Sequence, residues 1–268
     1  MPLATQVSCM EWMDAQGRAR AAHDWSPPPG TLRVTTLEAH TEGEPLRVIF
    51  AGVPDPEAGD GSVPSRRLVA IRDLEIQRRA LMWEPRGHAD MYGALLLPPE
   101  RPDSAAAVLF LHNEGWSTMC GHGILALGRV LVETGLVEAS APETRFTLDT
   151  PAGPVHVVSR VARDGRVGAV RFVNVASWVQ ALDREVSVPD WGTVRFDLAY
   201  GGAFYAFVDA PSLGLELRPA STPELVRAAR AIKAAAAEAV PPQHPDDPSL
   251  SFLYGVIFTG PPDDPTHH

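Results

Sequence analysis

The chain has 268 residues, 45% of them hydrophobic, and a formal net charge of −10 at pH 7. Its apolar content is that of an ordinary globular protein, and its length allows one large domain or two smaller ones. The acidic balance argues against nucleic acid or an anionic membrane as a partner, because both attract basic surfaces. A small anionic ligand is not excluded, since it feels only the local field of its site.

Cysteine usage and the lack of long apolar runs bear on the compartment. Cys9 and Cys120 are too few for a disulfide framework and lack the spacing of a metal site. No stretch approaches the length of a membrane span. The first 30 residues also lack the apolar core of a secretory signal. We therefore expect a cytoplasmic protein that does not associate with membranes.

The first part of the chain predicts a loose leader, two strands and a helix. Residues 1–30 show no sustained hydrophobic period and end in a proline-rich turn. Extended runs follow at 32–37 and 46–51, and helical spacing of apolar residues covers 65–83. The arginines of that helix are interpreted as a solvated outer face. They are Arg66, Arg67, Arg72, Arg78 and Arg79.

The most apolar part of the chain predicts a strand, a loop and a central helix. The strand, 106–111, leads into a polar loop with two good N-cap residues, Ser117 and Thr118. The helix begins at or beside Cys120, is apolar nearly all the way round and ends at Gly135. Such a helix has no solvent face and must be sheathed on every side. The residues expected to be almost fully buried are Ile124, Leu127 and Leu131.

Beyond the central helix the pattern changes to hairpins. A hairpin is predicted at 146–161 and an extended run at 167–179, with a domain boundary near Ser177. The remaining predicted elements are a hairpin at 186–198, a strand at 203–208, a helix beginning at Thr222 and a strand at 250–258. The chain is thereby divided into a leader, 1–30, a first half, 31–177, and a second part, 178–268.

Cys120 occupies a distinctive electrostatic position at the mouth of the central helix. Unpaired N–H groups and the positive end of the helix dipole favour a thiolate there, which lowers the pKa of the thiol. Gly121 and Gly123 would let a ligand lie close to those N–H groups. The alternative is that Cys120 is a small buried hydrophobe, as most buried free cysteines are.

Four motifs resemble the proline racemase family, which includes hydroxyproline epimerases and trans-3-hydroxy-L-proline dehydratases. They occur in the family's order, and the resemblance runs from about Leu32 to the end of the chain. They are Glu84-Pro-Arg-Gly-His-Ala-Asp-Met-Tyr-Gly-Ala94, Met119-Cys-Gly-His-Gly123, Asp149-Thr-Pro-Ala-Gly153 and Tyr200-Gly-Gly-Ala-Phe-Tyr-Ala-Phe-Val208. The resemblance implies an α/β (α+β) fold of the proline racemase and diaminopimelate epimerase type. Each of its two similar halves is a curled sheet around a central helix.

The resemblance also implies a cofactor-independent reaction on a small molecule, hydroxyproline or proline. Cys120 would act as the base that takes the Cα proton, a role that needs a pKa near the working pH. The amides of Gly121 and His122 would bind the substrate carboxylate. Tyr92 stands where the family places an aromatic ring against the substrate. No metal is expected, and a homodimer is left open.

The type of reaction depends on a motif that this chain lacks. Family members continue with Asp-Arg-Ser-Pro-(Cys or Thr)-Gly, which opens a second central helix, so we expect a truncated chain with an incomplete second half. A second Cys there goes with racemases and epimerases, and a Thr with dehydratases. The segments 110–116, 200–207 and 252–255 favour a dehydratase. The alternatives are an epimerase or racemase, and a truncated form that only binds a pyrrolidine carboxylate.

Two other site types are less favoured by the spacing. Gly121-His-Gly123-Ile-Leu-Ala126 matches a dinucleotide-binding pattern, but the loop after the preceding strand is too long for that motif. Zinc binding by Cys120 and His122, or His122 acting as a base for Cys120, is disfavoured because helix neighbours two apart face opposite sides.

One loop of the chain departs from the family pattern. The family usually has Asp where Glu38 stands and a small residue where Glu42 stands. These two side chains could crowd or repel an anionic ligand. No site residue is therefore assigned to the loop at 40–45.

Overall fold

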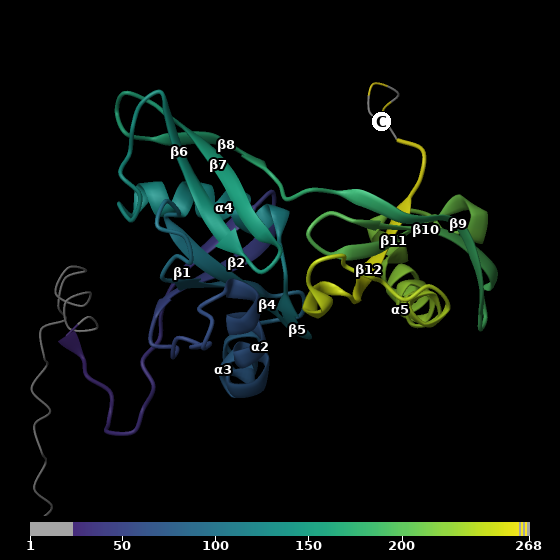
Figure 1. The fold of residues 1–268 in the computed structure, drawn as a ribbon, viewed down its shortest axis with the longest axis horizontal. Coiled ribbons are helices and arrows are strands. Elements are labelled where there is room, and N and C mark those ends of the chain that lie inside the picture. The colour runs from purple at the N-terminus through teal and green to yellow at the C-terminus, as the bar shows by residue number, and fades with distance from the viewer. Residues whose placement is uncertain (1–23, 263, 265, 267–268) are drawn as a thin grey trace, which may run out of the picture.

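The computed structural model describes residues 24–262, 264 and 266, so positions 1–23 of the predicted leader lie outside the described part. The described chain forms two lobes side by side, joined by the crossing from β8 (Val167–Val173) to β9 (Trp178–Val188) (Figure 1). We call residues 35–173 the first lobe and residues 178–259 the second lobe. A division into separate domains near Ser177 stays a prediction.

The first lobe is one eight-stranded sheet in the order β1-β2-β3-β4-β6-β7-β8, with β5 paired to β4. Its other strands are β1 (Thr35–Thr41), β2 (Glu44–Ala51), β3 (Tyr92–Leu97), β4 (Ala106–His112), β5 (Gly115–Ser117), β6 (Glu143–Thr150) and β7 (Gly153–Val161). Helix α4 (Gly121–Glu133) contacts β1 and β2 at one edge and β7 and β8 at the other (Figure 1). The sheet therefore curls around α4, which confirms the arrangement expected for the first half.

The burial of α4 follows from its sequence. Ile124 and Leu127 are fully buried and Leu131 is 1% exposed, and each contributes about 1.5–3 kcal/mol by leaving water. Exposed Arg129 and Glu133 form an ion pair at 2.9 Å on the one open strip. The helix ends before Gly135, whose φ of 76° is the left-handed conformation predicted for its C-terminal cap. The predicted central helix is confirmed.

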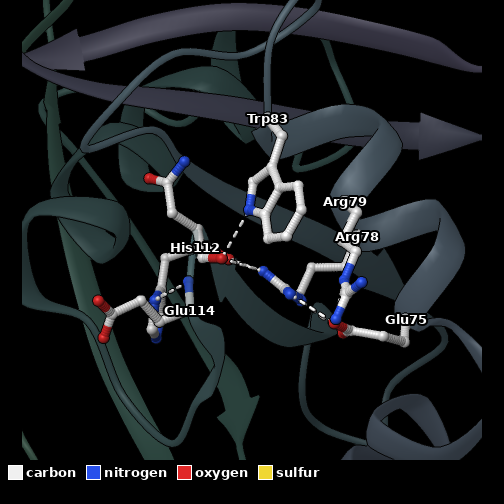
Figure 2. Close-up of polar contacts among 7 residues, drawn as sticks. Glu75, Arg78, Arg79, Trp83, His112 and Glu114 are labelled. Carbon is white, nitrogen blue, oxygen red and sulfur yellow. Dashed lines mark hydrogen bonds and ion pairs between the residues drawn. The ribbon is translucent and has the colours of Figure 1, made fainter.

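Two predictions for residues 65–83 were wrong, that of a single helix and that of a solvated face of arginines. The structure breaks it at Leu74 into α2 (Val63–Asp73) and α3 (Glu75–Met82), which cover the outer face of the sheet (Figure 1). Three of its arginines are buried, not solvated: Arg66, Arg67 and Arg78 are 9%, 6% and 2% exposed. A buried guanidinium must satisfy its donors. Arg78 does so on the carbonyl oxygens of His112 and Asn113 and on the carboxylate of Glu75 (Figure 2).

The second lobe is a four-stranded sheet in the order β12-β11-β10-β9. Its further elements are β10 (Gly192–Tyr200), β11 (Phe204–Asp209), α5 (Thr222–Ala239) and β12 (Leu253–Thr259), with short 3-10 helices at Pro211–Leu213, Pro219–Ser221 and Pro248–Leu250. The predicted hairpin is confirmed, with Val188 paired to Gly192. Helix α5 packs on one face through Ala228, Ile232 and Ala236. Within the described chain no helix is long and apolar enough to cross a membrane.

Candidate active site

Cys120 is the N-cap residue of α4. Its backbone is extended, with φ −147° and ψ 111°, and its Sγ accepts a hydrogen bond from the Gly123 amide at 3.4 Å. The two residues predicted as caps have other roles. Ser117 Oγ donates to Met119 O at 3.0 Å, and Thr118 Oγ1 donates to Gly202 O in the second lobe at 2.5 Å. The helix thus begins beside Cys120, as predicted, with sulfur in place of a hydroxyl as the cap.

The four predicted site residues, Tyr92, Cys120, Gly121 and His122, line one cavity of about 400 Å³. The cavity lies between the lobes, because the second lobe supplies part of its wall. The residues from the second lobe and the linking segment are Asn174, Gly201, Ala203, Tyr205 and Tyr254. A ligand held here would therefore contact the N-terminus of α4 and the sheet of the second lobe together.

His122 is within reach of the Cys120 thiol. Its Nδ1 lies 3.2 Å from Sγ, and its Nε2 lies 3.3 Å from Pro45 O. A carbonyl oxygen can only accept, so Nε2 carries the ring proton and Nδ1 faces the sulfur as an acceptor. The sequence-based view that these two side chains face opposite sides was wrong. Helical spacing does not apply to them, because Cys120 precedes the helix in an extended conformation.

The environment of Cys120 holds it as a thiol. Burial raises its pKa from 9.0 to about 11, while the Gly123 amide, the Tyr92 hydroxyl and the His122 amide act in the opposite direction. The charge of Glu44, which also lines the cavity, is a smaller contribution in the same direction as burial. The lowered pKa of Cys120 expected from the helix dipole was therefore wrong. Desolvation of a 7% exposed residue is the larger effect.

Three tyrosines form the aromatic wall of the cavity. The Tyr92 ring lies edge-on to the His122 ring with centroids 5.0 Å apart, and its hydroxyl is 3.4 Å from that of Tyr254. The Tyr205 ring is 5.4 Å from the Tyr254 ring. Burial raises the pKa of all three phenols, so they are neutral hydrogen-bond donors at neutral pH. Sequence reasoning missed Tyr205 and Tyr254 as site residues, although both lie inside segments that carry the resemblance.

The two glycines of the helix start have different functions. A Cβ on Gly123 would lie 2.6 Å from Phe110 Cε1, so this glycine lets α4 pack against β4. A Cβ on Gly121 would meet Phe172 Cζ at an ordinary 3.5 Å. Packing therefore explains Gly123, whereas Gly121 faces the cavity. The sequence interpretation that both glycines make room for a ligand is thus wrong for Gly123 and stays a prediction for Gly121.

The acidic residues of the first hairpin are not placed as expected. Glu38 is exposed and forms an ion pair with Arg47 at 2.6 Å. Neither Glu38 nor Glu42 lines the cavity, but Glu44 does. Among the described residues, no group of three or more His, Cys, Asp or Glu side chains could hold a metal ion.

Comparison with known proteins identifies the family. The proline racemase family model matches residues 36–268. The human trans-3-hydroxy-L-proline dehydratase is 47% identical over 235 residues, which cover 86% of this chain and 66% of that protein. The 3-hydroxyproline 2-epimerase of Burkholderia multivorans is 44% identical over 233 residues, 87% of this chain and 68% of that one.

A solved structure agrees with these matches. The hydroxyproline epimerase of Agrobacterium vitis, with bound trans-4-hydroxy-L-proline, has a TM-score of 0.80 and 34% identity. The match covers 87% of this chain and 67% of that structure. The present chain thus spans about two thirds of the length of these relatives. It belongs to the proline racemase family.

Proposed function

We propose that this chain carries the proton-abstracting part of an active site that dehydrates trans-3-hydroxy-L-proline. The observation that carries this proposal is the pairing of Cys120 Sγ with the unprotonated Nδ1 of His122, 3.2 Å apart, at the start of a buried helix. This arrangement on the wall of an interlobe cavity supports a role for Cys120 as the base and for His122 as its proton acceptor. The human relative supports the choice of substrate, because it is a trans-3-hydroxy-L-proline dehydratase.

The helix start would bind the substrate carboxylate. Amides at a helix N-terminus bind anions, and the dipole adds to their effect. The amides of Gly123 and Ile124 already donate to Cys120, which leaves those of Gly121 and His122 for the ligand. The same dipoles would stabilise the negative charge that develops on the carboxylate as the Cα proton leaves. The Tyr92 ring would lie against the pyrrolidine.

Proton abstraction requires the thiolate of Cys120. Because burial raises the thiol pKa to about 11, the thiol proton must pass to His122 Nδ1 before the reaction. The thiolate then takes the Cα proton, and the electron pair of the broken C–H bond forms a double bond between Cα and C3. The C3–O bond breaks, and the hydroxyl leaves as water with the proton from His122. This returns both side chains to their starting states, and the enamine product tautomerises to a cyclic imine without a redox change.

Epimerisation is the second candidate, supported by the Burkholderia relative, which is a 3-hydroxyproline 2-epimerase. It uses the same abstraction by Cys120, but a second acid must return a proton to the opposite face of Cα. Binding of a pyrrolidine carboxylate without turnover is the non-enzymatic alternative. It would follow if the cavity holds the ligand but does not orient it for reaction.

Dehydration, epimerisation and binding without turnover can be separated by incubation in deuterated water. The substrates are trans-3-hydroxy-L-proline, trans-4-hydroxy-L-proline and L-proline, each used in turn. A dehydratase would consume trans-3-hydroxy-L-proline alone and give a cyclic imine, which o-aminobenzaldehyde detects. An epimerase or racemase would place deuterium at Cα of a hydroxyproline or of L-proline and leave the ring intact. Binding of pyrrole-2-carboxylate without either reaction would reject both enzymatic functions and leave the binding module.

The expected localisation, oligomeric state and independence from metals stay proposals. We infer a cytoplasmic protein from its cysteine usage, and we propose a homodimer on the family resemblance. Light scattering on the purified protein measures the oligomeric state. Activity that survives exhaustive chelation would agree with the expected independence from metals.

A further inference from the structure

A second cavity, of about 620 Å³, lies between the lobes and shares Tyr254 with the Cys120 cavity. The first lobe lines it with Arg67, His112 and Trp116, and the second lobe with Lys233, Phe252 and Tyr254. Figure 2 shows part of the first-lobe wall, where the turn carrying His112 and Glu114 meets α3. No role in the proposed reaction accounts for this cavity.

Lys233 is chemically unusual in this chain. It is the single lysine of the chain, whose other 22 basic residues of the lysine and arginine type are all arginines. It lies half-buried in α5. In the part of the chain that the structure describes, no carboxylate lies within ion-pair distance of its ammonium group.

The acidic residues of this cavity are already neutralised. Glu75 forms ion pairs with Arg78 at 2.6 Å and with Arg79 at 2.7 Å. Glu114 forms one with Arg230 of α5 at 3.1 Å. These carboxylates therefore have partners other than the cations of the cavity wall. The charge left over at the cavity is positive, in a chain whose net charge is −10.

Arg67 is the second cation of the cavity wall that has no carboxylate within ion-pair distance in the described part of the chain. Its side chain is buried, and its Nε and Nη2 both donate to Trp116 O, at 3.1 and 2.7 Å. Its guanidinium also lies 5.1 Å from the Phe252 ring centroid. Burial lowers the pKa of Arg67, and Asp247 raises it from beyond ion-pair distance. A desolvated cation with neutral partners is costly, and an anion in the cavity would offset that cost.

His112 adds a neutral donor to the same wall. Its pKa is lowered from 6.5 to about 4, mainly by burial and also by the nearby charges of Arg78, Lys233 and Arg67, against the effect of Glu114. Its Nδ1 accepts from the Glu114 amide at 3.2 Å, so its proton is on Nε2. The positive charges of both lobes therefore converge around an imidazole that cannot itself hold a charge at neutral pH.

The geometry points to a binding site for a small polyanion, such as phosphate or a dicarboxylate, between Arg67 of the first lobe and Lys233 of the second. The anion would neutralise two cations that have no carboxylate within ion-pair distance among the described residues, and it would bridge the two lobes. It would also contact Tyr254, which faces the Cys120 cavity as well. The site does not depend on the chemistry of Cys120.

Titration calorimetry with inorganic phosphate and with malonate, at constant ionic strength set by sodium chloride, tests the site. We expect Lys233→Gln to weaken binding by about tenfold or more, because it removes a charge-assisted contact, and Lys233→Arg to restore most of it. Arg166→Gln is the matched control, since Arg166 is 83% exposed on the first lobe and pairs with Asp164. Equal affinity of Lys233→Gln and the unchanged protein for both anions would overturn the site.

The single lysine allows an independent measurement. Acetylation with an amine-reactive ester, followed by mass spectrometry of the peptide containing Lys233, reports on this side chain alone. Phosphate or malonate should slow its acetylation about fivefold or more, as a bound anion covers the amine and holds it as an ammonium. Protection by only one of the two anions would identify the class of ligand that the site binds. Protection by neither anion would overturn the site. Cys120→Ser should be protected like the unchanged protein, so that failure here is distinct from failure of the proposed reaction.

Discussion

In both lobes the sheet reaches its helix with strands from both edges, β1, β2, β7 and β8 at α4 and β9 and β12 at α5, but it encloses α4 and covers only one face of α5. Helix α4 is accordingly buried along almost its whole length, and α5 through one stripe of small and branched residues. The chemical groups follow the same division. The thiol and imidazole come from the enclosed helix, and the second lobe contributes tyrosines that close the cavity.

Carboxylates are also used differently in the two lobes. Asp149 of the first lobe is fully buried and accepts hydrogen bonds from the amides of Glu100 and Arg101, from Ser104 Oγ and from the Arg101 guanidinium. Asp183 of the second lobe pairs with Arg195 at the surface, and both side chains are about two thirds exposed. The first lobe, which carries the start of α4, therefore contains a buried carboxylate whose hydrogen bonds are satisfied. The second lobe, which closes the cavity, has its carboxylate in a solvated ion pair.

The largest effect is expected at the reactive end of α4. Cys120→Ser should lower the rate of Cα deuterium exchange about 1000-fold or more, because an alcohol is not ionised at this site. Mass spectrometry of the recovered amino acid measures the exchange, and Cys9→Ser is the control that should keep the full rate. Exchange that persists in Cys120→Ser would mean that the base lies elsewhere in the cavity.

The same substitution made in each lobe tests the difference between their carboxylates. Asp149→Asn should lower the free energy of unfolding by about 3–5 kcal/mol, because it leaves a buried network without its charge and one acceptor oxygen. Asp183→Asn should change it little, since surface ion pairs contribute little. Urea denaturation measures both. Equal losses would show that the second lobe depends on its surface pair as much as the first does on its buried one.

The sequence was sufficient to predict α4, because the residues that indicate this helix are close together in the chain. The apolar run from Ile124 to Val132 and the glycine after the helix, Gly135, lie within twelve consecutive residues. The buried arginines could not be predicted in this way. Arg67 and Arg78 are satisfied by carbonyl oxygens 49 and 34 positions away, on Trp116 of β5 and on His112 at the end of β4. Local charge spacing cannot distinguish such a contact from a solvated face.

The candidate site was predicted from motifs and completed by strand pairing. Tyr92, Cys120 and His122 follow from the resemblance, but the Cys120–His122 contact depends on an extended N-cap that helical spacing does not reveal. Tyr205 and Tyr254 meet because β11 and β12 run parallel, with Tyr205 opposite Gly255. That register joins positions about fifty residues apart, so nothing in the local pattern specifies it.

The pH dependence of alkylation tests how strongly the first lobe desolvates its thiol. With a pKa of about 11, the thiolate fraction rises with pH throughout the range below it. Iodoacetamide labelling of Cys120 should thus be about 100-fold faster at pH 9 than at pH 7. The measurement uses Cys9→Ser, so that one thiol reacts. A flat profile over this range would show that His122 already holds a thiolate in the free protein.

The smallest expected effect concerns the contact by which the second lobe closes the cavity. Gly202 has φ 102°, and a Cβ there would lie 2.7 Å from Met119 Cβ, next to Cys120. Gly202→Ala must therefore strain its backbone or move the second lobe away from the helix start, at a cost of about 1–3 kcal/mol. Gly214→Ala is a matched control, because Gly214 also has a positive φ, 70°, but a Cβ there has open space away from the cavity. If the cavity needs both walls, pyrrole-2-carboxylate should bind about tenfold more weakly to Gly202→Ala than to Gly214→Ala. Equal affinities, measured by calorimetry, would mean that the first lobe alone holds the carboxylate and that the tyrosines of the second lobe do not contribute to binding.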